Sequence, residues 1–230
     1  MPRYAIPTWD LPSLPVIGSD ELFPIRRVYC VGRNYAAHAR EMGHDPNREP
    51  PFFFCKPADA VVLADGGRIP FPSATSNLHH EVELVVALQS GGTDIPESAA
   101  LDCVFGYAVG VDLTRRDLQD EAKKLARPWD MSKGFDRSAP CGPIRRASEI
   151  GHPRKARISL EVAGTLRQDG DIAAMIWNVP ETIAYLSGLV ALQPGDLIFT
   201  GTPEGVGKVE PGALLAGTVE GVGGMRVTVG

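Results

Sequence analysis

Glycine and proline restrict the fold of this chain more than any other residues. The 230 residues include 25 glycines and 20 prolines, and both residue types mark turns and interrupt helices. This content favours many short strands over long helices. β-Branched and aliphatic runs predict strands at 25–31, 52–55, 61–63, 82–88, 104–111, 158–163, 166–168, 197–200, 213–220 and 225–229.

Helices are expected at only a few places, namely 34–43, 96–101, 114–126 and 180–191. Ala163-Gly164 and Gly223-Gly224 have the residues of hairpin turns. Because strands outnumber helices without βαβ alternation, the sequence predicts an α+β, mostly β fold, with a mixed, mostly antiparallel sheet and peripheral helices. Residues 1–24 contain five prolines and predict an irregular N-terminal arm, while residues 25–230 predict a single domain.

The composition is that of a globular protein and does not exclude an anionic small-molecule substrate. The net charge is −5 and no basic run exceeds an arginine pair, which argues against nucleic acid as a partner. No stretch approaches the roughly 18 apolar residues of a membrane span, and the N-terminus lacks an apolar signal segment. The cysteines form no C-x-x-C pair, which predicts reduced thiols in a cytoplasmic protein; they are Cys30, Cys55, Cys103 and Cys141.

Two glutamates one residue apart form the first candidate site. Side chains alternate faces along a strand, so Glu81 and Glu83, at the start of the expected 82–88 strand, share a face. Two like charges so close on a half-buried strand need compensation, which a divalent cation would supply. The alternative is an edge strand on which both glutamates face water.

Asp112 follows the expected 104–111 strand, whose small residues leave room for a ligand or another backbone. Asp112 could also cap the helix expected after it. If it meets Glu81 and Glu83 in space, three carboxylates form an oxygen-only site for Mg²⁺ or Mn²⁺. The sequence alone leaves the structural and metal-binding roles open.

A histidine and a carboxylate are neighbours on the helix expected at 34–43. His38 and Glu41 are three residues apart and therefore lie on one helical face. A carboxylate beside an imidazole raises its basicity, as a water-activating base requires. An ordinary exposed His–Glu pair is the alternative.

Lys56 and Lys133 each follow bulky apolar residues and adjoin Pro or Gly. This setting suits a cation at a pocket rim, although most lysines are solvated surface residues. Thr202 lies in Thr200-Gly201-Thr202-Pro203, where hydroxyl and backbone N–H groups could bind an anion. No Gly-Lys-Ser/Thr follows this segment, which excludes a nucleotide phosphate loop.

Taken together, these segments resemble the fumarylacetoacetate hydrolase family over residues 25–230. The residues that carry the resemblance are Tyr29 to Tyr35, His38 with Glu41, Phe54 to Pro57, His79 to Leu84, Gly110 to Asp112, Arg116 to Gln119, Trp129 with Lys133, Gly195-Asp196 and Thr200 to Pro203. The resemblance implies a rolled mixed β-sheet, usually in a homodimer. It also implies that Mg²⁺ or Mn²⁺ binds at Glu81, Glu83 and Asp112.

The resemblance implies roles for other residues as well. His38 and Glu41 would form a dyad on a lid helix, with Lys133 as a further catalytic group. The long diketone hydrolases of the family have an additional metal-binding aspartate where this chain has Val31, which places the chain with the short acylpyruvase-type branch. The residues implied in substrate binding are Lys56, Gln119, Thr202 and Arg33.

Within that branch, Leu14 to Asp20 and Glu41 to Pro46 resemble segments of bacterial fumarylpyruvate hydrolases of gentisate breakdown. The implied function is metal-dependent hydrolysis of a C–C bond in a 2,4-dioxo acid, giving fumarate and pyruvate from 3-fumarylpyruvate. Three alternatives use the same metal site: hydrolysis of another acylpyruvate, decarboxylation of oxaloacetate, and tautomerisation of an oxo acid. A catalytically silent metal-binding or ligand-sensing module is a further hypothesis.

Overall fold

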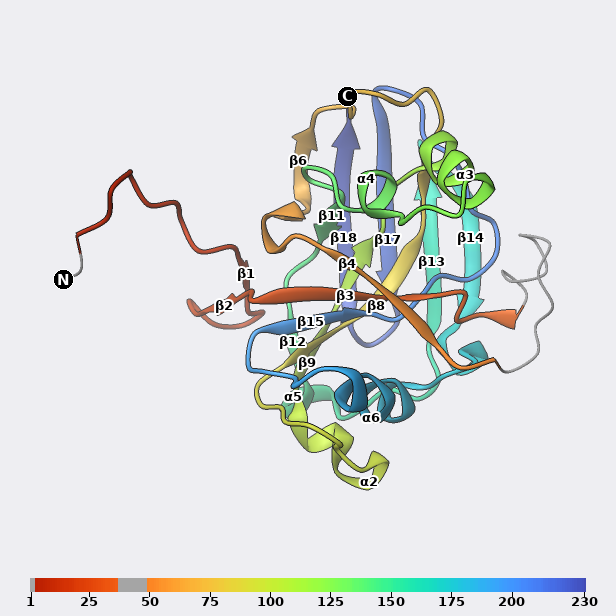
Figure 1. Ribbon diagram of the computed structural model, residues 1–230. Helices are drawn as coiled ribbons and strands as arrows, with labels where there is room; N and C mark the ends of the chain where they lie inside the picture. Colours follow the sequence, from red (N-terminus) through yellow and green to blue (C-terminus); the bar gives the residue numbers. More distant parts are fainter. Residues whose placement is uncertain (1–2, 37–48) are drawn as a thin grey trace.

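A computed structural model describes residues 3–36 and 49–230, and its strands form two large sheets that run across one another (Figure 1). The larger sheet has the spatial order β4 (Phe52–Lys56), β3 (Arg27–Gly32), β15 (Asp196–Phe199), β8 (Val82–Leu88), β9 (Val104–Val111), β11 (Ala139–Cys141) and β5 (Val61–Leu63), with β12 (Arg145–Arg146) also paired to β9. The second sheet has the order β14 (Thr165–Asp171), β13 (Arg157–Val162), β17 (Ala213–Val219), β18 (Gly223–Val229) and β6 (Asp65–Ile69).

Two small sheets complete the strand pairing of the described residues. One has the order β10 (Thr114–Arg115), β7 (Leu78–His80) and β16 (Gly207–Lys208), and the other pairs β1 (Ser13–Pro15) with β2 (Leu22–Pro24). The pairs β15–β3, β11–β5 and β18–β6 are parallel, while the other strand pairs of these sheets are antiparallel. The predicted α+β, mostly β fold with a mixed sheet is therefore confirmed.

The helices are short and lie around the sheets (Figure 1). They are α2 (Glu97–Ala100), α3 (Arg116–Lys124), α4 (Asp130–Lys133), α5 (Ala147–Ile150) and α6 (Val179–Leu189). Single 3₁₀ turns occupy 58–60, 101–103 and 172–174. Across the described part of the chain, no helix has the length and apolar character needed to cross a membrane.

The central strand β8 is buried along its whole length. Leu84 and Val86 belong to the core between the two large sheets, whereas Val85 and Ala87 belong to a second core on the opposite face. A continuous aliphatic run is typical of a strand covered on both faces. The expectation of a half-buried strand was therefore wrong, and an edge position that would leave its glutamates in water is excluded.

The N-terminal segment is more ordered than its prolines predicted. β1 and β2 pair as an antiparallel ribbon, and Leu14 and Phe23 are buried in the second core. Residues 13–24 are therefore not irregular, because their apolar side chains cover the outer face of the large sheet. Residues 3–12 extend away from the body (Figure 1). The division into an arm and one catalytic domain stays a prediction.

Local predictions had mixed outcomes. The hairpin turn at Ala163-Gly164 is confirmed, with φ of 50° and 77° between β13 and β14. The turn predicted at Gly223-Gly224 is wrong, because residues 220–222 make that turn and Gly223 begins β18. The helix predicted from residue 114 begins at Arg116, since β10 occupies the preceding two positions. Most of the helix predicted at 34–43 lies outside the described residues.

Candidate functional site

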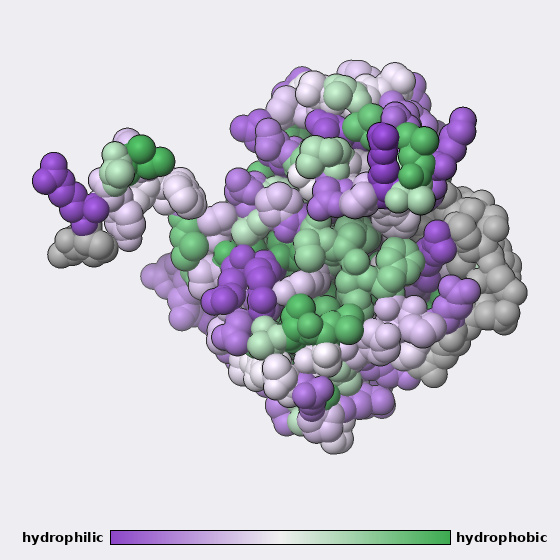
Figure 2. All heavy atoms as spheres, in the orientation of Figure 1, coloured by the Kyte–Doolittle hydropathy of each residue, from purple (hydrophilic) through white to green (hydrophobic). Residues whose placement is uncertain are grey.

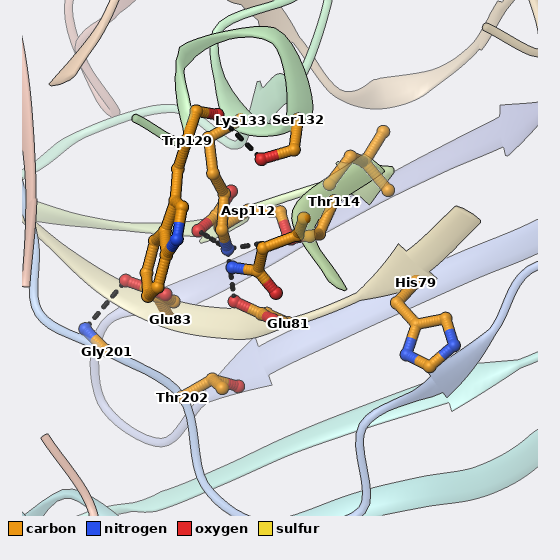
Figure 3. Close-up of polar contacts among 12 residues, drawn as sticks. His79, Glu81, Glu83, Asp112, Thr114, Trp129, Ser132, Lys133, Gly201 and Thr202 are labelled. Atoms are coloured by element: carbon orange, nitrogen blue, oxygen red, sulfur yellow. Dashed lines mark hydrogen bonds and ion pairs between the residues drawn. The ribbon is translucent and has the colours of Figure 1, made fainter. Parts of the chain in front are cut away.

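β8 and β9 bring the three predicted carboxylates together at one end of their antiparallel pairing. Glu83 pairs with Gly110, and the Asp112 N–H donates to the Glu81 carbonyl at 2.8 Å. The carboxylate triad, Glu81, Glu83 and Asp112, offers buried oxygens that all lie within 4.8 Å of one another (Figure 3). The N-cap of α3 is Arg115, so the alternative role of Asp112 as a helix cap is excluded.

Three buried cations surround the triad. Lys133 Nζ lies 2.8 Å from Glu81 and 2.5 Å from Asp112, and Lys56 Nζ lies 2.8 Å from the other Asp112 oxygen. Arg116 pairs with the second Glu81 oxygen. Three formal negative charges are thus balanced by three formal positive charges. Such pairing offsets part of the cost of burying charge.

The three cations do not neutralise the three triad carboxylates equally. Glu83 accepts a hydrogen bond from the Gly201 N–H at 2.7 Å. Burial, followed by repulsion from Asp112 and Glu81, raises the pKa of Glu83 well above its ordinary value. Burial lowers the pKa of Lys133, but the Asp112 and Glu81 carboxylates outweigh it, so this pKa is raised overall. The lysine is therefore a stable ammonium, whereas ionised Glu83 needs further positive charge.

The donor set fits a hard divalent cation. Asp112 Oδ1 is buried and accepts no hydrogen bond of suitable geometry from the described residues, so it has capacity for a ligand. All three triad side chains offer carboxylate oxygen, the donor that Mg²⁺ and Mn²⁺ prefer. Neither Cys nor His occurs among the described residues that line the cavity around the triad. The site could therefore hold Mg²⁺ or Mn²⁺ rather than a metal that prefers sulfur or nitrogen ligands.

The cavity around the triad has a volume of about 40 Å³. Its lining includes the predicted catalytic Lys133 and the predicted substrate residues Arg33, Gln119 and Thr202. The structure thus brings these four side chains to the triad. This volume is sufficient for an ion with water.

Other predicted residues lie elsewhere. Lys56 is 3% exposed and contacts Asp112 from outside the cavity lining; it also donates to the Leu113 carbonyl at 3.3 Å and to the Lys133 carbonyl. This position supports the triad and places Lys56 behind it. His38 and Glu41 lie outside the described residues, so the dyad stays a prediction.

Gln168 is a part of the site that sequence reasoning missed. It is fully buried, and its side-chain oxygen accepts the Val82 N–H at 3.0 Å. Its amide donates to Thr202 Oγ1 at 2.8 Å and to the Pro203 carbonyl at 2.9 Å. Gln168 therefore ties the start of β8 to the loop that presents Thr202. A single Gln in a polar strand gives no signal of this role in the sequence.

Two residues beside the lysine were also missed. Lys133 Nζ donates to Thr114 Oγ1 of β10 at 2.7 Å, which helps to fix the position of the ammonium (Figure 3). Arg116 donates to Gln119 and to His79 Nδ1 at 3.3 Å. Arg116 carried part of the family resemblance, and the Arg116-x-x-Gln119 spacing on a helix could have indicated that the two side chains meet.

Fold and site together define a class of protein, a mixed β roll with an all-carboxylate centre suited to a divalent cation. Residues 27–230 match the fumarylacetoacetate (FAA) hydrolase C-terminal family, and the chain belongs to this family. The match covers almost all of the described structure and confirms the resemblance drawn from the sequence motifs.

The relatives to which the chain is similar are named for different reactions. The chain is similar to the crystal structure of fumarylpyruvate hydrolase from Pseudomonas aeruginosa in complex with Mn²⁺ and pyruvate, with 56% identity, a TM-score of 0.97 and 99% coverage of both chains. It is 43% identical over 204 residues to the rat mitochondrial oxaloacetate tautomerase FAHD1, covering 89% of this chain and 91% of the relative. It is 41% identical over 190 residues to the mitochondrial oxaloacetate decarboxylase of Dictyostelium discoideum, covering 83% and 87%.

Proposed function

We propose that this protein is an enzyme that hydrolyses a C–C bond in a 2,4-dioxo acid, with 3-fumarylpyruvate as substrate and fumarate and pyruvate as products. The observation that carries the proposal is the similarity to the Pseudomonas aeruginosa enzyme over 99% of both chains. That enzyme was crystallised with pyruvate, which is one of the two proposed products. The buried triad beside Lys133 supports the same chemistry.

The triad would hold Mg²⁺ or Mn²⁺. When bound, such an ion supplies Lewis-acid stabilisation to substrate oxygens that gain negative charge. Gln119 and Thr202 line the same cavity and would orient the acid by hydrogen bonds. Gln168 would keep the Thr202 hydroxyl in place through its 2.8 Å hydrogen bond.

Lys133 would stabilise charge at the reacting carbons. Its raised pKa keeps the ammonium protonated at neutral pH, and Thr114 orients it. The ammonium donates to the oxyanion that forms when water adds to the C4 carbonyl. When the C3–C4 bond breaks, its electron pair stays on C3, and a proton from the ammonium converts this enolate into pyruvate. The acyl carbon leaves with the oxygen and the remaining proton of the water as a carboxylic acid, which releases that proton to solvent and becomes fumarate.

His38 and Glu41 would remove the proton from the attacking water. A carboxylate beside an imidazole fixes its tautomer and raises its basicity. Such a general base typically contributes about 10²–10⁴-fold to the rate. The proton taken from water replaces the one that Lys133 gives to C3, so the cycle closes without another reactant.

A second candidate function is tautomerisation or decarboxylation of oxaloacetate. The curated relatives at 43% and 41% identity support it. These reactions also pass through an enolate beside a carboxylate, but neither needs an attacking water. Lys133 and the triad would serve both chemistries, and the His38–Glu41 pair would be required as a water-activating base only for hydrolysis.

The test compares substrates on one preparation. Mn²⁺-loaded protein is incubated separately with 3-fumarylpyruvate, acetylpyruvate and oxaloacetate, the enol absorbance is followed, and the products are identified by chromatography. Equal amounts of fumarate and pyruvate from fumarylpyruvate would support the proposal. Turnover of oxaloacetate with fumarylpyruvate left intact would refute it in favour of the second candidate.

We further propose that the protein forms a homodimer in which residues 3–12 contact the partner. Tyr4, Ile6 and Trp9 are 64%, 70% and 80% exposed, and the segment extends away from the body beyond Pro12, whose carbonyl accepts the Ile25 N–H (Figures 1 and 2). Apolar side chains gathered on such a segment indicate a contact surface. Light scattering should give a dimer for the full chain and a weaker dimer, or a monomer, after removal of residues 1–12. An unchanged dimer would exclude this role.

A further inference from the structure

The cavity that contains the carboxylate triad has two more cations in its wall. Arg33, which follows β3, and Lys123, in the last turn of α3, both line it. The Lys123 side chain is 27% exposed and lies 3.8 Å from the exposed Asp120 carboxylate. The Glu49 carboxylate acts to raise the pKa of Arg33. Among the described residues, Arg33 makes no salt bridge. Among the residues that the structure describes, neither cation is paired with a buried carboxylate, unlike Lys56, Lys133 and Arg116.

Aromatic rings support both cations. The Arg33 guanidinium lies 5.4 Å from the centre of the Phe52 ring, and Lys123 Nζ lies 5.5 Å from the centre of the Trp129 ring. Phe52 and Trp129 meet edge to face with centroids 5.4 Å apart, and Phe54 lies 5.9 Å from Trp129. We call these three rings the aromatic wall. Phe54 and Trp129 line the cavity, and Phe52 packs against Trp129 behind this lining, with Arg33 over it. Cation–π contacts of this kind stabilise a charged side chain without neutralising it.

The positive charge of Arg33 acts on Lys123. Burial lowers the pKa of Lys123, as do the positive charges of Arg116 and, less strongly, Arg33, whereas the carboxylates of Asp120 and Glu81 act to raise it. Burial likewise lowers the pKa of Arg33. Two half-buried like charges repel, and an anion placed between them would relieve that repulsion. Arg33 and Lys123 therefore give their side of the cavity the electrostatic character of an anion site, which is separate from the triad but within the same cavity.

We propose that Arg33 and Lys123 bind the terminal carboxylate of the substrate's acyl group, and that the aromatic wall contacts its flat conjugated chain. The inference rests on the proposed function, in which the pyruvoyl end of the acid lies at the triad. 3-Fumarylpyruvate has a carboxylate at each end and a planar, conjugated acyl chain between them. Such an acid would meet the triad at one end and the paired cations at the other. The site then selects acylpyruvates that end in a carboxylate over those with a neutral acyl group.

The test uses binding and needs no turnover. 2-Oxopimelate and 2-oxoheptanoate have carbon chains of the same length as fumarylpyruvate, differ only in the terminal carboxylate, and lack the second carbonyl that hydrolysis requires. Calorimetric titration of Mn²⁺-loaded protein should show about 10- to 100-fold tighter binding of 2-oxopimelate, as expected for charge-assisted hydrogen bonds. Lys123→Met and Arg33→Gln should each reduce this affinity ratio about 10-fold. Lys123→Arg, which keeps a cation, should retain most of it.

Lys124→Met is the matched control. Lys124 is the next residue of α3 and is exposed, and it is outside the cavity lining, so the affinity ratio should stay at the wild-type value. Equal affinities of wild-type protein for the two acids would overturn the proposal, as would the same loss in the Lys123 and Lys124 variants. A preference for 2-oxopimelate in a protein that leaves fumarylpyruvate intact would refute the proposed function and leave the carboxylate site standing.

Discussion

In the absence of divalent ions, Glu83→Gln should stabilise the protein. Glu83 is 1% exposed, and burial, followed by repulsion from Asp112 and Glu81, raises its pKa well above the ordinary value. Glutamine removes the charge and keeps a side-chain oxygen for the Gly201 N–H, which donates to Glu83 at 2.7 Å. The variant therefore loses a buried charge and retains the hydrogen bond.

The change in the free energy of unfolding with pH follows from the raised pKa of Glu83. Above about pH 4.3, the ordinary pKa of glutamate, the folded state holds a proton at Glu83 that the unfolded state releases. The free energy of unfolding then falls as pH rises, by up to about 1.4 kcal/mol per pH unit, until the pH passes the folded-state pKa. Over two pH units the advantage of Glu83→Gln should grow by roughly 2–3 kcal/mol.

Urea unfolding in EDTA between about pH 5 and 8 measures this difference. Glu121→Gln, on the exposed side of α3, is the control and should show a small, pH-independent effect. Mn²⁺ should reverse the order, because wild-type protein gains about 2.7 kcal/mol at a concentration 100 times Kd and the variant lacks a ligand. A stability difference in EDTA that stays flat with pH, or a less stable Glu83→Gln, would show that the charge on Glu83 is already compensated.

Three further changes test the site and its support. Gln168→Leu leaves two buried backbone groups, the Val82 N–H and the Pro203 carbonyl, without their partner. It should lower the free energy of unfolding by about 2–4 kcal/mol. A loss below about 1 kcal/mol in urea unfolding would show that Gln168 does not hold these two segments together. Gly110→Ala would place a Cβ 2.6 Å from the Phe199 ring and should cost about 1–3 kcal/mol, which calorimetric unfolding would measure against the wild-type protein. His38→Ala should slow turnover of fumarylpyruvate about 10²–10⁴-fold with Mn²⁺ affinity unchanged, and weaker Mn²⁺ binding would instead place His38 among the metal ligands.

The sequence predicted the strands that are defined by their own side chains. The ranges 82–88 and 104–111 have the bounds of β8 and β9, because long β-branched and aliphatic runs have little alternative to a buried strand. β6 was missed because its sequence, Asp65-Gly66-Gly67-Arg68-Ile69, has no strand pattern. It is extended because its backbone pairs in parallel with β18 at the far end of the chain, and a local pattern contains no information about that partner.

The same distinction applies to the site. The triad could be predicted because Glu81 and Glu83 share a strand face and Asp112 ends the next long strand. Gln168 could not, because it reaches Val82 across 86 residues through a side chain whose type has no preferred chemistry. The position of Lys56 behind the triad was also beyond the sequence, since a lysine after an apolar strand can end in water or in the interior.

Charge balance gives a reason to expect the proposed metal site and the proposed substrate site to be one site. When Glu83 is ionised, as a metal ligand must be, the three carboxylates carry the same total charge as Lys56, Lys133 and Arg116. A divalent ion then brings an excess of two positive charges into a buried cavity, where charge interacts strongly. An acid with two carboxylates carries the charge that removes this excess. The ion and such an acid should therefore strengthen each other's binding. An ion in the triad also competes with Lys133 for the carboxylates of Glu81 and Asp112, and an ammonium displaced from them is free to contact a substrate oxygen in the same cavity. We therefore expect Lys133 to be free for its proposed chemistry only once a divalent ion has joined the carboxylate triad.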